Sequence, residues 1–452
     1  MCKIMIPEDV QNMLDELQKN GFSAYIVGGC VRDSILGKIP HDYDICTSAK
    51  PDDMLSVFKE YDVYETGLKH GTLTVAGNDD MYEITTYRTD GEYKDGRHPE
   101  TVSFVDNIEE DLSRRDFTIN AMAYNNEVGL IDPFNGQEDI NKKLIRCVGN
   151  PNNRFNEDAL RILRAIRFAS TYGFDIEDKT KLSIHKNKHL LQKISAERIT
   201  SEFSKIISCA DANLLDEYKD VFAEFIPEIK PMFHLNQHNP WHCYDVYMHT
   251  AHAVENAPKN DIIVRLAMFF HDIGKPEVFT IRENGVGHFY GHPIVSAEMQ
   301  ENIMRRMKFD NNTIKLVNQL VENHDRRFNG KSKNAKKILR DIGEEQTRRL
   351  ITVQKCDTLA QAKIPETAKC LQTLSNAENV INEIIENKEP YKISDLAING
   401  NDIVALGITG PSVKKVLEML VNNVIGSPKT NTKESLLKIA TNFAKEENIL
   451  HK

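Results

Sequence analysis

The feature that most constrains the fold is the stretch 24–46, AYIVGGCVRDSILGKIPHDYDIC. It opens with an apolar run that reads as a buried strand, and Gly28 and Gly29 end that strand. A helical turn is expected next, and then a second short strand that carries Asp42 and Asp44. Because alternate residues of a strand face the same side, these two carboxylates are expected to lie together, about 7 Å apart along the chain.

This strand–turn–helix–strand pattern favours metal-assisted phosphate chemistry. Two acids on one rigid strand repel each other unless a cation lies between them, and hard oxygen ligands suit Mg²⁺. The glycines let the backbone approach a phosphate, and Arg32 supplies positive charge beside it. A Gly-Gly pair alone is commonly a simple turn, and Asp-x-Asp occurs by chance. Together, at this short spacing, they predict a phosphate and metal site.

Composition places the chain among soluble globular proteins. Its 452 residues, 40% hydrophobic and 27% charged, leave room for roughly two to four domains. A net charge of −10 argues against a general polyanion-binding surface but allows a local basic one. The eight cysteines are scattered without a CxxC pair, which is typical of reduced cytosolic thiols. With no signal segment and no apolar run of transmembrane length, we expect a cytoplasmic protein.

A second informative stretch, FNEDALRILRAIRFAS, reads as a helix with a charged and an apolar face. Asp158, Arg161 and Arg164 are three residues apart, and Arg167 continues the series. Such spacing is commonly a solvated, salt-bridged face. The functional interpretation is a polar edge that can read a base, because arginine donates hydrogen bonds in a fork and aspartate accepts them.

Three further features lie between these two stretches. Glu83, on a predicted strand, is a potential third acid near the metal, although an exposed strand residue is the commoner case. The polar segment 89–100, TDGEYKDGRHPE, is expected to be a loop, either plain or positioning substrate. Arg115, in RRDFTINAMA, is either a surface charge or a contact to a triphosphate or ribose.

The middle of the chain is rich in histidine. Nine of the fifteen histidines fall between His234 and His324. A single buried histidine is usually just part of a core, but an adjacent His-Asp pair with further His and Asp on other helices suits a divalent metal and hydrolytic chemistry. The predicted set is His249, His271, Asp272 and Asp357, with His292 and His324 nearby.

Together these motifs resemble the class II tRNA nucleotidyltransferases, the bacterial CCA-adding enzymes, with an HD domain. The likeness covers nearly the whole chain, through VGGCVRDSILG…HDYDI, RRDFTINAMA, DPFNG, EDALRILR, ISAERI…EF and the tail segment LAINGNDIVALGITGPS. It implies an α+β fold, in which a polymerase-β-like head of mixed sheet and helices is followed by an all-α neck, HD body and tail. The implied boundaries are 1–140 for the head, 141–215 for the nucleotide-selecting neck, 216–365 for the HD domain and 366–452 for a tRNA-binding tail.

The resemblance also implies a role for each site residue. Asp42 and Asp44 would be catalytic and would bind Mg²⁺, and Asp158 with Arg161 would pair with the base edge of ATP or CTP. DPFNG would be a flexible joint between head and neck. The implied nucleotide-binding residues are Gly29, Arg32, Arg115, Asp158, Arg161, Arg164 and Arg167. The implied HD metal ligands are His249, His271, Asp272 and Asp357.

The implied activity is addition of C, C and A to the 3′ end of tRNA from CTP and ATP, without a nucleic-acid template and with release of pyrophosphate. Expected partners are tRNA, ATP and CTP, with no membrane and no protein partner. Expected cofactors are Mg²⁺ and a second divalent metal at the HD site, where hydrolysis of phosphate ends is a further activity. Alternatives are a poly(A) polymerase, an HD phosphohydrolase with an RNA-binding N-terminal half, and an HD set kept as a structural remnant.

Overall fold

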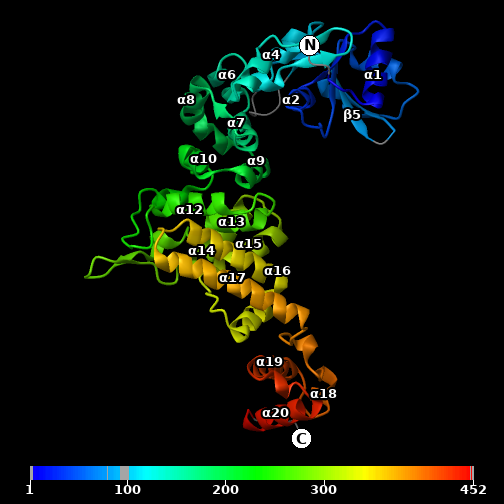
Figure 1. Ribbon diagram of the computed structural model, residues 1–452. Coiled ribbons are helices and arrows are strands. Elements are labelled where there is room, and N and C mark those ends of the chain that lie inside the picture. Colours follow the sequence, from blue (N-terminus) through cyan, green and yellow to red (C-terminus); the bar gives the residue numbers. More distant parts are fainter. Residues whose placement is uncertain (1–3, 79, 92–100, 448, 450–452) are drawn as a thin grey trace. The chain divides into compact units, whose positions relative to one another are not determined.

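The computed structural model describes residues 4–78, 80–91, 101–447 and 449, and the chain divides into two compact units (Figure 1). The first unit comprises Met1–Ala210 and Glu217–Pro227, and the second comprises Asp211–Asp216 and Glu228–Lys452. Residues 92–100 of the predicted loop lie outside the described residues.

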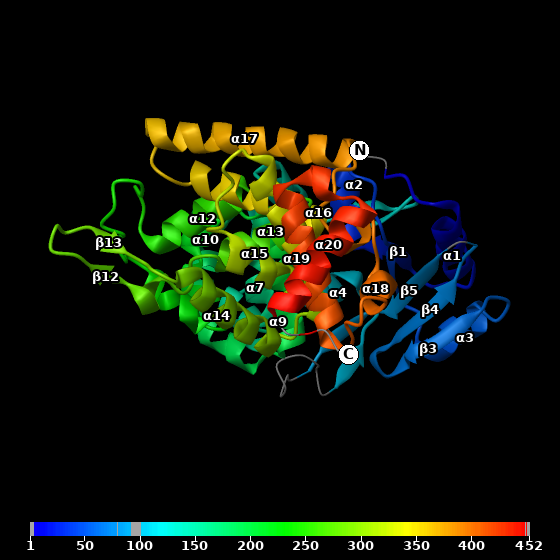
Figure 2. The ribbon, with the colours of Figure 1, turned by 90° about the horizontal axis from the view of Figure 1, so that it is seen from below.

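A seven-stranded mixed sheet is the framework of the first unit. The strand order is β3-β4-β5-β2-β1-β8-β9, and Figure 2 shows β3, β4 and β5 side by side. The pair β2–β5 is parallel and the other pairs are antiparallel. The strands are β1 Ala24–Val27, β2 Asp44–Thr47, β3 Val63–Gly67, β4 Thr72–Ala76, β5 Met81–Thr86, β8 Ala123–Asn125 and β9 Gly129–Ile131.

Strand β1, inside the sheet, is apolar because it is buried along its whole length, whereas β5, also inside the sheet, alternates between buried residues and more exposed ones. All four residues of β1 are buried, and one cluster of the core joins β1, β2 and β8 to α4. The fully buried side chains of Val27, Tyr87 and Leu112 belong to this cluster. The stretch that begins with β1 is thereby fixed at the centre of the unit.

Helices and short strand pairs complete the first unit. The helices are α1 Glu8–Lys19, α2 Gly29–Ile35, α3 Pro51–Val57, α4 Ile108–Ser113, α5 Gly136–Asn141, α6 Pro151–Glu157, α7 Leu160–Tyr172, α8 Asp178–Asn187, α9 Ala196–Cys209 and α11 Lys219–Phe222. The pair β6 Arg88–Asp90 and β7 Val102–Phe104 is antiparallel, and the pair β10 Leu144–Ile145 and β11 Asp175–Ile176 is parallel.

Tight turns connect these elements where the sequence predicts them. In DPFNG, the Asp132 carboxylate accepts hydrogen bonds from the backbone N–H groups of Gly136 and Gln137, at 2.6 and 2.9 Å. A Cβ atom at Gly136 would lie 2.3 Å from the Thr118 carbonyl oxygen, so only glycine fits at the start of α5.

The second unit is almost entirely helical. Its helices are α10 Ala212–Glu217 (whose last residue belongs to the first unit), α12 Val246–Asn256, α13 Ile262–Phe270, α14 His292–Arg306, α15 Asn311–Asn323, α16 Ser332–Leu359, α17 Pro365–Glu386, α18 Gly400–Val404, α19 Pro411–Gly426 and α20 Lys433–Glu446. A kink at Gly343 interrupts α16. The strands β12 Thr280–Ile281 and β13 Gly287–His288 form a small antiparallel pair.

The expected α+β class, with a mixed sheet in the head and helices after it, is confirmed. One detail differs, because the part expected to be all-α includes the pairs β10–β11 and β12–β13. Each of these strands is two residues long, too short to produce an alternating pattern in the sequence. Among the described helices, none combines the length and the apolar character that crossing a bilayer requires.

Two candidate functional sites

The turn from β1 into α2 brings the backbone against an arginine. Gly28 has φ 76° and ψ −121°, a conformation that favours glycine. A Cβ atom there would lie 2.9 Å from Nη1 of Arg115. The Gly28 N–H donates to the Met122 carbonyl oxygen at 3.2 Å, which holds the turn against the end of β8. The glycine therefore leaves room for a guanidinium above the turn.

Of the two predicted catalytic acids, Asp44 lies at the start of β2 and Asp42 precedes the strand. Asp44 is the first residue of the strand, in register with Val27 of β1 and Glu83 of β5. The expectation that Asp42 also lies on the strand was wrong, since β2 begins two residues later. The reason is that β1 ends at Val27, opposite Asp44, and the chain turns away into α2 at Gly28, so β1 offers Asp42 no residue to pair with.

These carboxylates form an acidic group that suits a cation. Desolvation raises the pKa of Asp44, and although Arg115 lowers it, Asp42 and Glu83 raise it further. A divalent ion would relieve this repulsion and would find the hard oxygen donors it prefers. Glu83, which sequence reasoning left outside the predicted set, is thus a third acid of the group. The sequence feature that could have indicated Glu83 is its position on the predicted strand that became β5.

Arg115 is held by an acid behind it. The side chain of Asp111 on α4 is fully buried, and its two oxygens lie 2.8 Å from Arg114 and 3.3 Å from Arg115. Although burial raises the pKa of this carboxyl, the two guanidinium groups lower it below its usual value, so Asp111 is charged at neutral pH. Within the described structure, the buried Nε of Arg115 has no hydrogen-bond partner.

Helix α7 presents three arginines at one-turn spacing, as the sequence predicts. Arg161, Arg164 and Arg167 all lie on α7. The expectation that Asp158 belongs to the same helix was wrong, because it is extended (φ −141°, ψ 106°) between α6 and α7. Its Oδ1 accepts the backbone N–H of Leu160 at 3.0 Å. The physical reason is capping, since an aspartate before a helix satisfies an amide that would otherwise be free.

Asp158 has a partner that the sequence did not indicate. Nη2 of Arg198 on α9 lies 2.7 Å from Asp158 Oδ2. Arg161, which was expected to act beside Asp158, instead donates to Glu157 at 2.7 Å and to the Arg114 carbonyl oxygen at 3.1 Å. Only tertiary packing brings Arg198 here, because forty residues separate it from Asp158.

A buried polar chain links α7 to α2. Asp116 Oδ2 accepts from Arg164 Nε at 2.8 Å, and its Oδ1 accepts from the Asn120 amide at 3.0 Å. The Asn120 oxygen in turn accepts from Arg32 at 2.5 Å. Burial raises the pKa of Asp116, but Arg164 and the Asn120 hydrogen bond lower it to about 2. Asp116 and Asn120 are functional candidates that sequence reasoning did not select.

One aromatic ring lies among three of these cations. The guanidinium of Arg167 is 4.0 Å from the centre of the Phe168 ring, that of Arg32 is 5.2 Å away, and that of Arg164 is 5.4 Å away. Such contacts fix the planes of the guanidinium groups. Arg167 also forms an ion pair of 2.5 Å with Glu202.

All nine predicted residues of the first unit line one pocket of about 530 Å³, called here the head pocket. Seven arginines and four aspartates line it, so its local charge is opposite in sign to the net charge of the chain. This arrangement suits a polyanion at one end of the pocket and a cation at the other. The lining residues are Gly28, Gly29, Arg32, Asp42, Asp44, Arg114, Arg115, Asp116, Asn120, Asp158, Leu160, Arg161, Arg164, Arg167, Phe168 and Arg198.

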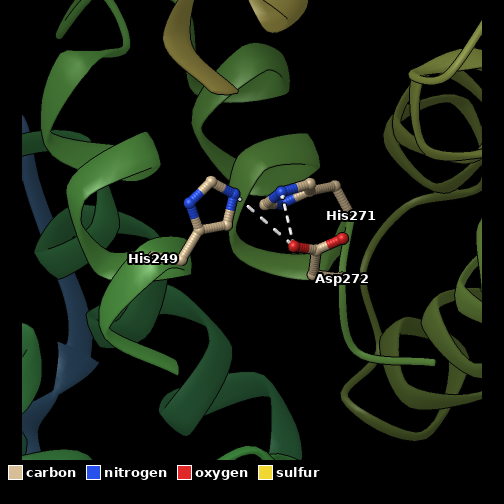
Figure 3. Close-up of side chains that lie close together, drawn as sticks. All are labelled: His249, His271 and Asp272. Atoms are coloured by element: carbon tan, nitrogen blue, oxygen red, sulfur yellow. Dashed lines mark ion pairs between the residues drawn. The ribbon is translucent and has the colours of Figure 1, made fainter. Parts of the chain in front are cut away.

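The second unit brings the predicted histidines and aspartates into one buried cluster, called here the HD cluster. Figure 3 shows His249 and His271 directed toward Asp272. His249 lies on α12, His271 and Asp272 follow α13, and Asp357 lies near the end of α16. His292 begins α14, and His324 directly follows α15. Helix packing alone assembles the cluster, since its members span more than a hundred residues of chain.

The distances within the cluster are short enough for shared coordination. Asp272 Oδ2 lies 3.1 Å from Nε2 of His271 and 3.6 Å from Nε2 of His249. Nε2 of His249 is 2.9 Å from Asp357 Oδ1. Among the described residues, none gives the buried Nε2 of His271 a hydrogen bond of good geometry, although Asp272 lies close to it. A buried nitrogen without such a bond, surrounded by acids, fits a metal ligand.

The other ring nitrogen of each histidine fixes its orientation. Nδ1 of His271, His292 and His324 lies within 2.6–2.9 Å of the carbonyl oxygens of Met268, Phe289 and Val321. A carbonyl oxygen can only accept, so these Nδ1 atoms carry the protons and the Nε2 lone pairs face the cluster. This is the usual arrangement behind metal-ligating histidines.

Charge in the cluster is uneven. Burial raises the pKa of Asp272, but His271 and Lys275 beside it hold this pKa well below its usual value. Burial, with His271 and His292 nearby, lowers the pKa of His324 to about 4. A pocket of about 280 Å³, called here the HD pocket, lies over Asp272 and Asp357 and is also lined by Lys275 and Arg327. Cations beside a metal-ligating set favour a phosphate group there.

Family models match three segments of the chain. The model described as "Poly A polymerase head domain" matches residues 24–146, the one described as "Probable RNA and SrmB- binding site of polymerase A" matches 173–232, and the one described as "HD domain" matches 241–362. The first of these spans β1 to β10, and the last spans the HD cluster.

Curated relatives match about half of the chain. A CCA-adding enzyme of Lactobacillus delbrueckii subsp. bulgaricus is 46% identical over 219 residues, which are 48% of this chain and 54% of that protein. One from Geobacillus thermodenitrificans is 49% identical over 196 residues, 43% of this chain and 48% of that protein. The chain spans about half the length of these curated relatives.

Solved structures match over nearly the whole chain. The Bacillus stearothermophilus CCA-adding enzyme in complex with CTP is 28% identical, with a TM-score of 0.70, over 98% of this chain and 100% of that one. The Thermotoga maritima CCA-adding enzyme complexed with tRNA is 20% identical, with a TM-score of 0.61 over 98% and 97%, and so supports the fold alone. The resemblance that the sequence motifs indicate is confirmed in its domains and in its fold.

Proposed function

We propose, on the premise that the chain belongs with the tRNA nucleotidyltransferases that carry a poly A polymerase head domain and an HD domain, that it adds C, C and A to the 3′ end of tRNA. CTP and ATP are the substrates, pyrophosphate is released, and no nucleic-acid template is used. The relatives and the two solved structures named above are CCA-adding enzymes, which favours this activity over poly(A) synthesis.

The proposal rests on the head pocket, because the acidic pair Asp42 and Asp44 and seven arginines line the same space. Asp42 and Asp44 would hold Mg²⁺, which would activate the RNA 3′-hydroxyl and neutralise the leaving pyrophosphate. Gly28 and Gly29 would leave room for the triphosphate, and the guanidinium of Arg115, which lines the pocket, would lie beside it. The hydroxyl attacks the α-phosphorus, a bond to the tRNA forms, and the bond to pyrophosphate breaks.

The residues of the head pocket that lie on or next to α7 would select the base. Asp158 would accept from the amino group of cytosine or adenine, and Arg161 would donate to the ring edge. Arg164 and Arg167 would complete the wall, with Asp116 and Glu202 fixing their positions. Arg32, anchored by Asn120, would lie against the sugar or phosphate.

The four-part division into head (1–140), neck (141–215), HD domain (216–365) and tRNA-binding tail (366–452) is part of the proposal, and so is a cytoplasmic location. A small apolar core in the tail, which includes Ile403, Leu420 and Ala440, supports a separately folded last part.

The test is incubation with tRNA lacking its 3′ end, given CTP, ATP or both, followed by product sizing. We expect additions of two nucleotides with CTP and three with both. A long A tail from ATP alone would instead support the polymerase. A variant with Asp52→Ala, an exposed acid on α3, serves as the control.

A second activity is favoured by a separate observation, the convergence of histidine Nε2 atoms on Asp272 beneath the HD pocket. His249, His271, Asp272 and Asp357 would hold a divalent metal, and the pocket would hydrolyse phosphate groups at RNA ends. Phosphate release from RNA oligonucleotides with terminal phosphates measures this activity. If no phosphate is released in the presence of Mg²⁺, Mn²⁺ or Ni²⁺, the HD cluster does not have this hydrolytic activity.

A further inference from the structure

We propose that His288 and Tyr290 form a nucleobase-binding platform, called here the base platform, at the rim of the HD pocket, and that this pocket takes nucleoside phosphates. The proposal rests on the hydrolytic function proposed for the pocket and names its class of substrate. Figure 2 shows β12 and β13 extending as a hairpin from the helices of the second unit. His288 ends β13, and Tyr290 lies two residues before α14.

The two rings of the base platform are already stacked on each other. Their centres are 5.1 Å apart, and their planes differ by 6°. Tyr290 is 66% exposed, so His288 backs its ring while the ring itself stays largely open to solvent. Every nucleobase has a flat π face, and a base laid on the open side of Tyr290 would extend the stack.

Contacts around the hairpin hold the Tyr290 ring in place. Nη2 of Arg282 donates to the Tyr290 hydroxyl at 2.7 Å. Because the guanidinium carbon is 5.6 Å from the ring centre, this cation lies toward the hydroxyl end of the ring. The Gly287 N–H donates to the His238 carbonyl oxygen at 2.9 Å, which ties β13 to the segment that precedes α12. A ring held in this way loses little freedom when a base stacks on it.

The same pocket offers cations for a phosphate group. Lys275 and Arg327 line it together with His288 and Tyr290. Nζ of Lys275 is 5.2 Å from the centre of the Phe289 ring, and Phe289 is the residue between the two members of the base platform. A cation thus contacts the residue that joins the two rings, so the phosphate and the base of one nucleotide can reach both.

The volume of the HD pocket places the base outside it. This volume is about 280 Å³, against about 530 Å³ for the head pocket, which is the proposed site of a whole nucleoside triphosphate. The smaller space suits a phosphate and a sugar, with the base left at the rim, where the exposed ring of Tyr290 lies. A sugar phosphate without a base would occupy the pocket without using the base platform.

The test is photocrosslinking with 5-iodouracil, a base that forms covalent bonds to aromatic side chains on which it stacks. Two probes are irradiated with the full chain: an RNA oligonucleotide that ends in 5-iodouridine 3′-phosphate, and free 5-iodouridine 3′-phosphate. Peptide mapping by mass spectrometry separates the hairpin from the head pocket. We expect crosslinks at Tyr290, from the oligonucleotide if the pocket takes RNA ends and from the free nucleotide alone if it takes mononucleotides. Because stacking strengthens binding, uridine 3′-phosphate should compete at concentrations about 5- to 150-fold lower than ribose 5-phosphate.

The variants separate the ring from the rest of the hairpin. Tyr290→Phe keeps the ring and should keep the crosslink, and Tyr290→Ala should lose it. The matched control is Ile281→Ala, which removes an exposed side chain of β12 and should crosslink like the parent chain. Crosslinks confined to the head pocket, or equal competition by the two phosphates, would overturn the proposal. Crosslinking at Tyr290 without phosphate release would support the base platform and count against the hydrolytic function alone, whereas release without crosslinking would do the reverse.

Discussion

At the scale of single residues, each arginine of the head pocket is held from behind by an acid or an amide. Asp111 holds Arg115, and Asp116 holds Arg164. Arg32 is fixed by Asn120. Because these partners already fix the guanidinium groups, a triphosphate would not have to order them when it binds. The entropy cost of binding is therefore smaller.

We expect Asp42→Ala to abolish incorporation of both CTP and ATP. The variant leaves Asp44 without its neighbouring carboxylate and removes one proposed metal ligand, so the rate should fall by more than about 100-fold. Single-turnover incorporation of each radiolabelled nucleotide measures it. Asp52→Ala should behave like the parent chain. Incorporation retained in Asp42→Ala would contradict the metal assignment.

We expect Asp158→Ala to blur the choice between C and A more than it slows the chemistry. The variant removes an acceptor for the base and frees Arg198 from its 2.7 Å contact. One charged hydrogen bond contributes about 1.5–3 kcal/mol, so the ratio of kcat/KM for CTP and ATP should change by about 10- to 100-fold. Competition between the two nucleotides on tRNA ending in CC gives this ratio.

The control for this prediction is Glu197→Ala, which removes an exposed acid next to Arg198 on α9. Its selectivity should equal that of the parent chain. If Asp158→Ala were as selective as the parent, the proposed role in reading the base would be wrong.

At the scale of elements, short helices and turns determine where the acids and arginines lie. Helix α4 is six residues long, yet its Asp111 contacts the two arginines that follow it, the backbone N–H of Arg88 and the thiol of Cys46. The helix thus ties the strand β2 to the loop that carries Arg115. A short element becomes structurally important because a buried charge needs several partners.

We expect Asp111→Ala to destabilise the first unit by about 3–5 kcal/mol, because it leaves two largely buried guanidinium groups without their acid. Denaturant unfolding, followed by circular dichroism, measures the change. Glu110→Ala, an exposed position on the same helix, should change stability by less than about 0.5 kcal/mol. Equal stability of the two variants would show that Asp111 does not hold these arginines.

At the scale of the whole molecule, the two candidate sites belong to different compact units. Every residue that lines the head pocket lies in the first unit, and every residue that lines the HD pocket lies in the second. Each site can therefore be altered with little direct effect on the other.

We expect His271→Ala with Asp272→Ala to leave nucleotide addition near normal and to remove phosphate release from RNA ends. The two assays are run on the same preparation, with His252→Ala as the control for a histidine lost from the second unit. Loss of addition along with hydrolysis would mean that the HD cluster mainly supports the fold.

The sequence by itself determined the local features of this protein. An apolar run ended by Gly28 and Gly29 predicts β1, three arginines at one-turn spacing predict a helix, and DPFNG predicts a turn, and all three are present. The predicted residues of the head also meet in one pocket. These features depend on side-chain period and backbone conformation, which a short window of sequence specifies.

Only the tertiary structure decided which side chains meet across the chain. Asp158 left its predicted helix and paired with Arg198, Asp116 paired with Arg164, and Glu83 came into register with Asp44. Likewise, His292 and His324 were expected near the predicted metal set, but the contact between their Nε2 atoms could not be foreseen. Such pairs depend on how helices and strands pack, and packing is a property of contacts between distant residues that no local pattern encodes.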